Sequence, residues 1–351
     1  MWYAFFEVFV LEEMRSRSAK RIKKLHIIIA VLTAFCLLLC VVGVVGLSLV
    51  LKREGNYKSA IQRLNNTVSE KQRIIREDMI SKEVFKDYAA RYGVSTHFIQ
   101  QFVDDAIVYK NDYGIAYAPI DKSLAENEID FSKISEINGR KEYTDTEKFD
   151  VKTAVDVSSY QGYINWNSVA ADGVDCAIIR AGYRGYSAGD VVTDSYFHTN
   201  IRGALDAGLE VGVYFFSQAI TVEEAIAEAD FILSKISGYN VTLPIVFDME
   251  EISNAEARAN SLSAKEVTDI TVAFCERIKQ AGYTPMVYGN IEWMCDKMEL
   301  ERIDGYAKWF AQYTPKPFFP YDIYAWQYTE SGKVNGISTG ADLSLIFIPE
   351  E

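Results

Sequence analysis

Two carboxylate residues, Asp248 and Glu250, stand at the end of an apolar run in the stretch LPIVFDME. Two acids in such a position can perform general acid–base chemistry when one keeps a proton while the other is ionised. The same Asp-x-Glu spacing recurs at Asp145 and Glu147, but there the surrounding stretch is polar and has no apolar face. We therefore interpret Asp145 and Glu147 as solvated, and Asp248 and Glu250 as the candidate catalytic pair.

The elements around the pair decide where it lies. From about residue 152 the chain contains eight short strand candidates, and helical patterns separate the early ones. Strands that alternate with helices predict a mostly parallel sheet, and eight of them predict an α/β fold closed into a (β/α) barrel of the TIM type. The last three candidates follow one another too closely for helices, so we expect an irregular barrel. The candidates are TAVDV, DCAIIRA, EVGVYFF, LPIVFDM, PMVYGN, AKWFAQY, IYAWQY and ADLSLIF.

Three helices between these strands have clear signals. An apolar stripe runs from Phe197 to Leu205. Thr221 with Glu224, and Ser263 with Glu266, have the spacing of a capping box, and each pair precedes an apolar pattern of helical period. Both pairs therefore predict helix starts.

Strand periodicity predicts that the acids meet inside the barrel. Side chains alternate between two faces of a strand, so Asp248 and Glu250 lie on the face opposite to Phe247. Asp156 takes the same place at the end of the first strand, and Asp342 begins the last. Clustered carboxyls repel one another when ionised, so at least one should have a raised pKa. An acid beside an anion is the arrangement that glycoside hydrolysis requires.

Aromatic side chains on or just beyond the strand candidates offer surfaces on which sugar rings could stack; for each of them, core packing is the alternative. The candidates are Tyr160, Tyr214, Tyr288, Trp309, Tyr313 and Trp326. Arg180 either holds an acidic group of a substrate or pairs with a neighbouring carboxylate, and we favour the pairing.

The N-terminal part predicts a membrane anchor. Residues 25–51 contain no Asp, Glu, Lys or Arg and exceed the roughly 20 residues that cross a bilayer. The basic cluster RSRSAKRIKK precedes them, which favours a cytoplasmic N-terminus and an extracellular C-terminal part. We predict a single-pass protein of the cell membrane with a cytoplasmic tail (1–24), a transmembrane helix (25–51), a helical stalk and linker (52–151) and a catalytic barrel (152–351).

The stalk region carries weaker patterns. Apolar residues between 57 and 75 recur at helical spacing, consistent with a short helix and a weak homodimer seam. The stretch 81–110 predicts two helices that break at Gly93, with Ser95 as an N-cap. Residues 111–150 are polar and mixed, and we expect a partly ordered linker.

Composition excludes several classes of function. The chain has 351 residues with 36 Lys and Arg against 49 Asp and Glu, a net charge of −13, which argues against a nucleic-acid surface. The five cysteines and three histidines show neither disulfide nor metal-ligand spacing. We therefore expect no metal, cofactor or nucleic-acid partner.

Taken together, several segments between about Thr153 and Phe347 resemble the family 25 glycoside hydrolases. The resemblance implies a lysozyme that cuts the β-1,4 bond between N-acetylmuramic acid and N-acetylglucosamine in peptidoglycan, at the C-terminal ends of barrel strands and without a cofactor. The segments are AVDVSSYQGYINW, AIIRAGYRG, DSYFHTNIRGALDAGLEVGVYFFSQA, LPIVFDME, MVYGN, WFAQY and YAWQYTESGKVNGISTGADLSLIF.

The resemblance also implies residue roles. Glu250 matches the family's proton donor and Asp248 its companion, while Asp156 and Asp342 match the aspartates of the first and last strands. The chain departs from the family at Asn165, where Asp is frequent, and after Asp342, where Leu-Ser replaces the more usual x-Asn. Only the second departure affects expected substrate contacts.

Three alternatives stay open at this point. The first is a non-catalytic glycan-binding module on the same fold, against which the retention of all four acids argues. The second is a chitinase-like hydrolase, although the longer D-x-x-D-x-D-x-E run typical of those enzymes is absent. The third is a membrane-anchored scaffold that docks a partner.

Overall fold

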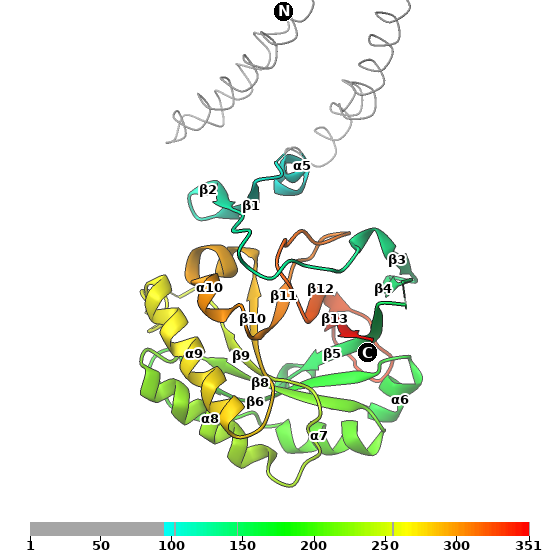
Figure 1. Cartoon of the computed structure of the whole chain (residues 1–351). Coiled ribbons are helices and arrows are strands. Elements are labelled where there is room, and N and C mark those ends of the chain that lie inside the picture. The colour runs from blue at the N-terminus through cyan, green and yellow to red at the C-terminus, as the bar shows by residue number, and fades with distance from the viewer. Residues whose placement is uncertain (1–94, 102, 146, 255, 351) are drawn as a thin grey trace, which may run out of the picture. The chain divides into compact units, whose positions relative to one another are not determined.

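The computed structural model describes residues 95–350 except 102, 146 and 255, and eight of its strands form a closed barrel (Figure 1). Each predicted strand is confirmed within a few residues. The barrel strands are β5 (Phe149–Val157), β6 (Cys176–Arg184), β8 (Glu210–Ser217), β9 (Ile245–Met249), β10 (Pro285–Asn290), β11 (Ala307–Ala311), β12 (Ala325–Gly332) and β13 (Ala341–Pro349).

The order of strands around the barrel is β5-β13-β12-β11-β10-β9-β8-β6, and β6 closes the ring on β5. Neighbouring strands run parallel except β13, which is antiparallel to both β12 and β5. The short strand β7 (Val191–Thr193) folds back on β6 outside the ring. The predicted irregularity is confirmed, because no long helix stands between β11, β12 and β13.

Helices cover the other strands from outside. They are α6 (Trp166–Ala171), α7 (Phe197–Asp206), α8 (Val222–Ile236) and α9 (Ala264–Gln280), followed by a π-helical turn η3 (Trp293–Lys297) and α10 (Leu300–Ile303). The two predicted N-caps are confirmed. The hydroxyl of Thr221 accepts from the Glu224 amide at 3.2 Å, and Ser263 forms a complete capping box with Glu266.

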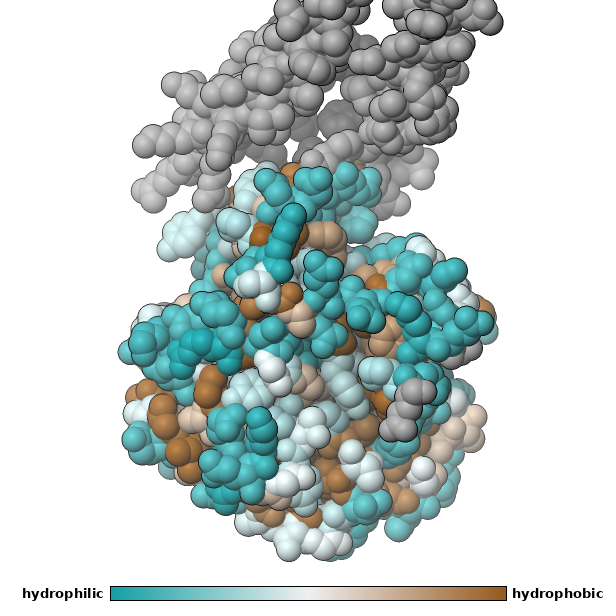
Figure 2. Space-filling view, in the orientation of Figure 1, coloured by the Kyte–Doolittle hydropathy of each residue, from teal (hydrophilic) through white to brown (hydrophobic). Residues whose placement is uncertain are grey.

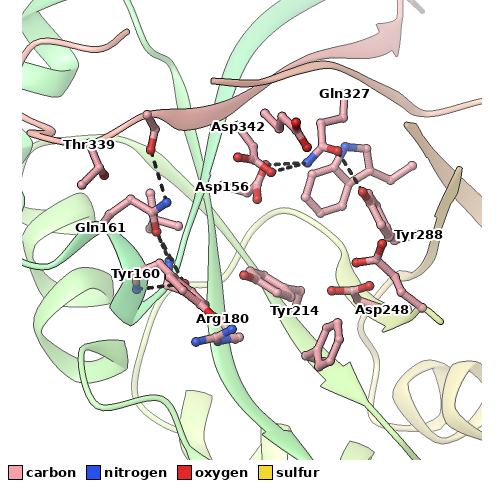
Figure 3. Close-up of a pocket in the computed structure, with 17 residues that line it drawn as sticks. Asp156, Tyr160, Gln161, Arg180, Tyr214, Asp248, Tyr288, Gln327, Thr339 and Asp342 are labelled. Atoms are coloured by element: carbon pink, nitrogen blue, oxygen red, sulfur yellow. Dashed lines mark hydrogen bonds between the residues drawn. The ribbon is translucent and has the colours of Figure 1, made fainter. Parts of the chain in front are cut away.

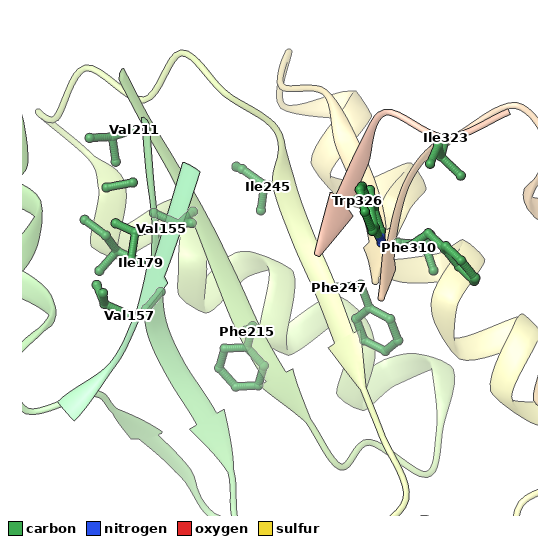
Figure 4. Packing of buried hydrophobic residues seen from close by; sticks show 14 of the residues in the cluster. Val155, Val157, Ile179, Val211, Phe215, Ile245, Phe247, Phe310, Ile323 and Trp326 are labelled. Carbon is green, nitrogen blue, oxygen red and sulfur yellow. The ribbon is translucent and has the colours of Figure 1, made fainter. Parts of the chain in front are cut away.

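The main core lies between the outer faces of the strands and these helices (Figure 4). Phe247 of β9 meets Phe274 of α9 with ring centroids 4.9 Å apart, and Phe215 of β8 meets Phe231 of α8 at 5.7 Å. Burial of each such ring contributes roughly 1.5–3 kcal/mol. A smaller cluster that includes Val246 fills the barrel interior, so the predicted alternation along β9 is confirmed.

The strands without helices are covered by the segment that precedes the barrel. This segment holds a hairpin of β1 (Ala106–Asn111) and β2 (Gly114–Pro119), the turn η1 (Phe131–Lys133), and a second hairpin of β3 (Ile134–Ile137) and β4 (Arg140–Tyr143). Phe131 packs edge-on against Trp326 at 6.3 Å, and Tyr143 against Phe347 at 5.4 Å. Residues 120–150 therefore occupy the place that helices fill elsewhere around the barrel.

Of the two helices expected in 81–110, the first lies outside the described residues, and the second is shorter than expected. Ser95 does cap a helix, but α5 (Thr96–Gln100) is short, and the residues expected to continue it form β1. The Gln100 side chain ends the helix by bonding to the carbonyl oxygens of Val103 and Ala106 and to the amide of Val108. The expected linker at 111–150 is more ordered than predicted, because it contains β2 and the hairpin of β3 and β4.

The cytoplasmic tail, the transmembrane helix at 25–51 and the stalk up to residue 94 lie outside the described residues. Within the described part, no helix has both the length and the apolar composition that a membrane span requires. The face of the molecule shown in Figure 2 carries many hydrophilic residues, and the apolar residues form small groups between them.

Candidate active site

A pocket of about 450 Å³ opens at the C-terminal ends of the parallel strands (Figure 3). Every barrel strand contributes to it either directly or through the loop that follows. Nine of the eleven predicted site residues line it: Asp156, Tyr160, Arg180, Tyr214, Asp248, Glu250, Tyr288, Trp309 and Asp342. The predicted convergence of the four acids is therefore confirmed.

Asp248 and Glu250 form a coupled pair at the end of β9. Asp248 is 6% exposed, and its Oδ1 has no hydrogen-bond partner among the described residues. Burial raises the pKa of Asp248 well above its usual range, and the carboxylates of Glu250 and Asp156 raise it further. Burial also raises the pKa of Glu250, while its hydrogen bond with Asp248 lowers it. Because two ionised carboxylates this close repel each other, the pair favours a state in which the two carboxyls share one proton.

Asp156 and Asp342 form a second pair across the antiparallel seam. They stand opposite each other in the register of β5 and β13. The Nε2 of Gln327 donates to both, at 3.1 Å to Asp156 and 3.2 Å to Asp342. Burial and the charge of Asp342 raise the pKa of Asp156 well above its usual range, and burial with the charge of Glu330 raises that of Asp342 to about 6.

Gln327 is a site residue that the sequence interpretation missed. Its Oε1 accepts from the hydroxyls of Tyr288 at 2.8 Å and Tyr313 at 2.9 Å, so this one amide joins two acids to two phenols. The alternation that placed Asp248 could have found it. Along β12 the same rule puts Gln327 inside and Trp326 outside.

Trp326 and Tyr313 do not line the pocket. Trp326 is fully buried on the outer face of β12, where its Nε1 donates to the Gln312 carbonyl and its ring meets Phe131. The prediction that it stacks on a sugar is wrong, because the segment before the barrel covers it. Tyr313 lies beside the pocket, and its hydroxyl donates to Gln327 Oε1.

Arg180 pairs with a carboxylate, as expected, and the partner is Asp194. Its guanidinium lies 2.8 Å from Asp194 Oδ2 and donates to Ser159 Oγ at 3.1 Å. It also sits 5.7 Å from the ring centroid of Tyr160. Arg180 therefore fixes the wall of the pocket, and its positive charge lowers the pKa of Asp248 without offsetting burial.

A buried network stands behind Glu250. Glu228 of α8 accepts from Arg184 Nε at 2.5 Å and from Ser217 Oγ at 2.7 Å, and burial raises its pKa to about 7. The next residue, Gln218, donates to the carbonyl of Glu250 at 3.2 Å. These contacts fix the backbone at Glu250. No sequence pattern predicts them.

The walls of the pocket add neutral donors. Burial and the surrounding carboxylates raise the pKa of Tyr214 and Tyr288 well above 10, so both hydroxyls keep their protons. The ring of Tyr288 meets Trp309 at 4.9 Å. No group of three or more His, Cys, Asp or Glu side chains in the described part is arranged to hold a metal ion. The chemistry that this pocket offers is proton transfer next to fixed negative charge.

Comparison with known families gives a match to this barrel. A family model described as "Glycosyl hydrolases family 25" matches residues 155–337, which is just over half of the chain. The matched span includes Asp156, Asp248 and Glu250 and ends before Asp342.

Two curated relatives are lysozymes. The autolytic lysozyme of Clostridium acetobutylicum is 27% identical over 190 residues, which are 54% of this chain and 54% of that protein. Lysozyme M1 of Streptomyces globisporus is 30% identical over 199 residues, covering 54% of this chain and 65% of that protein. The chain thus spans only about half to two thirds of the length of these relatives.

A solved structure shares this fold. The modular autolysin LytC of Streptococcus pneumoniae, in complex with a synthetic peptidoglycan ligand, superposes with a TM-score of 0.52 at 24% identity. The alignment covers 70% of this chain and 57% of that one.

Proposed function

The chain belongs to glycosyl hydrolase family 25, and from this premise we propose that it hydrolyses peptidoglycan. The bond cleaved is the β-1,4 bond between N-acetylmuramic acid and N-acetylglucosamine. The observation that carries the proposal is the buried Asp248–Glu250 pair, which keeps a proton beside an oxygen with no described partner. The names of the two curated relatives, both lysozymes, support the substrate class.

Glu250 acts as the general acid. When the bridging oxygen of a glycan lies next to Glu250, the proton that the pair shares is carried by Glu250. Glu250 then passes the proton to the leaving oxygen as the bond to the anomeric carbon breaks. Asp248, now ionised, faces the positive charge that develops on the sugar. Water completes the reaction by adding hydroxide to the anomeric carbon and returning a proton to Glu250.

Asp156 and Asp342 supply a fixed field on the other side of the sugar. Gln327 holds both carboxyls, so they need no rearrangement when charge develops in the transition state. Because the pKa of Asp342 is about 6, this carboxyl is mostly ionised at neutral pH. Trp309 and the neutral hydroxyls of Tyr214 and Tyr288 form a wall against which the sugar ring is held.

We further propose that residues 25–51 anchor the protein in the cell membrane, with the N-terminus cytoplasmic and the barrel on the outer face. The uncharged composition of that stretch and the basic cluster before it support this arrangement. Protease added to wall-stripped intact cells should then remove the barrel. A barrel protected until the membrane is lysed would contradict the proposal. The weak homodimer seam between residues 57 and 75 also stays a proposal.

The reaction is tested by the new chain ends. Purified peptidoglycan is digested, reduced with borohydride and analysed by mass spectrometry. Cleavage of the proposed bond converts muramic acid at the new ends to its alditol. Reduced glucosamine ends would identify a different bond, and no new ends with the wild-type protein would overturn the proposed activity.

A further inference from the structure

A shallow groove leaves the catalytic pocket across two neighbouring loops. Its volume is about 570 Å³, and it is formed by the loop after β5 and the loop between β12 and β13. We call it the tyrosine shelf; its main residues are Tyr160, Tyr163, Gly336, Ile337, Ser338 and Thr339. Tyr160, Gln161 and Thr339 line both the shelf and the pocket, so the two form one continuous surface.

The shelf displays two aromatic rings to solvent. Tyr160 is 82% exposed and Tyr163 is 76% exposed. None of the described residues that line the shelf carries a charge, and its polar groups are hydroxyls, the Gln161 amide and backbone. A surface of flat rings and neutral hydrogen-bonding groups suits an uncharged, hydroxylated ring such as a sugar. It offers nothing to pair with the charged groups of a peptide.

The loops that form the shelf are held in place before any ligand arrives. Ser158 and Gln161 make a reciprocal capping box that fixes the turn carrying Tyr160. The second loop is tied to the first by a bond from the Asn165 amide to the Gly336 carbonyl at 2.9 Å. Gly336 has a φ of +100°, and a Cβ there would lie 2.4 Å from the Asn165 carbonyl oxygen, so only glycine permits this contact. A preformed surface loses little conformational entropy on binding.

The shelf leads away from the acid pair. In Figure 3, Tyr160, Gln161 and Thr339 lie on one side of the pocket and Asp248 on the other, with Asp156 and Asp342 between them. The general acid must contact the oxygen that leaves, so the glycan continues past Glu250 on the leaving-group side. The sugars on the non-reducing side of the reacting sugar therefore extend in the opposite direction, away from Glu250.

We propose that the tyrosine shelf binds a saccharide unit of the glycan on the non-reducing side of the reacting sugar, with Tyr163 as the ring it stacks on. The assignment rests on the proposed hydrolase function and adds to it the direction in which the glycan lies.

The test uses the full-length chain with Glu250→Gln, which keeps bound glycan intact, and peptide-free hexasaccharides of the glycan strand. In this background Tyr163→Ala should weaken binding about three- to tenfold, the value of one aromatic contact. Tyr163→Phe should restore it. Tyr113→Ala is the matched control, because Tyr113 is 94% exposed and lines neither the shelf nor the pocket. Unchanged binding with Tyr163→Ala overturns the proposal, as does a loss that appears only when the glycan carries stem peptides.

Direction is read from an active chain and a hexasaccharide labelled at its reducing end. Without the Tyr163 contact, cleavage should shift towards the non-reducing end, because fewer preceding sugars are favoured. A shift in the opposite direction would place the shelf on the leaving-group side and overturn the assignment. A wild-type chain that cuts no glycan at all would instead refute the hydrolase function, so the two failures are distinguishable.

Discussion

The barrel has two unlike halves, and the catalytic pocket lies where they meet. From β6 through β10 the strands are parallel and backed mainly by the helices α7 to α9. From β11 through β13 to β5 no long helix intervenes, one strand is antiparallel, and residues 120–150 cover the outside. Each half gives the pocket one pair of carboxyls, and the second half also contributes the exposed Glu330. Asp248 and Glu250 come from the first, and Asp156 and Asp342 from the second.

The two pairs differ in how they are held. On the helix-backed half, Asp248 keeps an oxygen without a described partner and shares a proton with Glu250. On the other half, Gln327 donates to both acids. The amide of Gln327 fixes the second pair in place, whereas Oδ1 of Asp248 is buried without a described hydrogen-bond partner, which is energetically costly. The contrast supports the proposal that the first pair transfers the proton and the second stabilises charge.

The largest effect is expected from Glu250→Gln, because an amide cannot protonate the leaving oxygen. Release of reducing ends from peptidoglycan should fall by about 10²–10⁴-fold with the fold unchanged. Glu251→Gln is the matched control, since Glu251 is the exposed neighbour outside the pocket. A Glu250→Gln variant with more than about a tenth of wild-type turnover would remove Glu250 from the role of acid.

Asp248→Asn should also lower turnover strongly and should move the basic limb of the pH–rate profile to lower pH. Loss of the last proton from the pair leaves two neighbouring negative charges, so the apparent pKa of that proton is raised. Asparagine carries no charge and removes this effect. The profile is measured with wild type and variant on the same glycan. A basic limb that stays in place would show that the two carboxyls are not coupled.

Tyr143→Ala tests the cover on the strand-only half. Tyr143 is 8% exposed and meets both Phe149 and Phe347 edge-on, so its removal leaves a cavity against β5 and β13. The free energy of unfolding should fall by about 3 kcal/mol, as measured by urea denaturation. Phe274→Ala on the helix-backed half gives the reference value. A loss below about 0.5 kcal/mol would mean that the contacts of Tyr143 with the barrel contribute little to the free energy of unfolding.

Asp342→Asn should raise stability at neutral pH while lowering activity. Its folded pKa of about 6 lies above the unfolded value, so the folded state binds the proton more tightly and loses stability as pH rises from about 4 through 6. Allowing for partial solvent screening, the variant should gain on the order of 1 kcal/mol at pH 8 and nothing below about pH 4. Urea denaturation at both values checks this, with the exposed Glu147→Gln as control. Equal stability of variant and wild type at pH 8 would contradict the buried charge.

Much of the helix-backed half follows from local patterns. Strand alternation places Asp248 inside the barrel, and Ser263 with Glu266 marks the start of α9, because period and capping depend only on neighbours in the chain. The other half depends on contacts between distant residues. Alternation along β12 turns Trp326 outward, but its cover there is Phe131, nearly two hundred residues away in the chain. Strand β1 stands where a helix is expected because it pairs with β2 across the turn at Asp112 and Tyr113. Alternation along β12 is sufficient to predict that Gln327 points into the barrel.

The central claim is that Glu250 protonates the leaving oxygen, and the most direct test varies how much that oxygen needs the proton. Wild type and Glu250→Gln are compared on a glycan and on an aryl glycoside of the same sugar whose nitrophenolate leaves without protonation. If Glu250 is the acid, the variant loses about 10²–10⁴-fold on the glycan and far less on the aryl glycoside. Equal losses on both substrates would contradict that role.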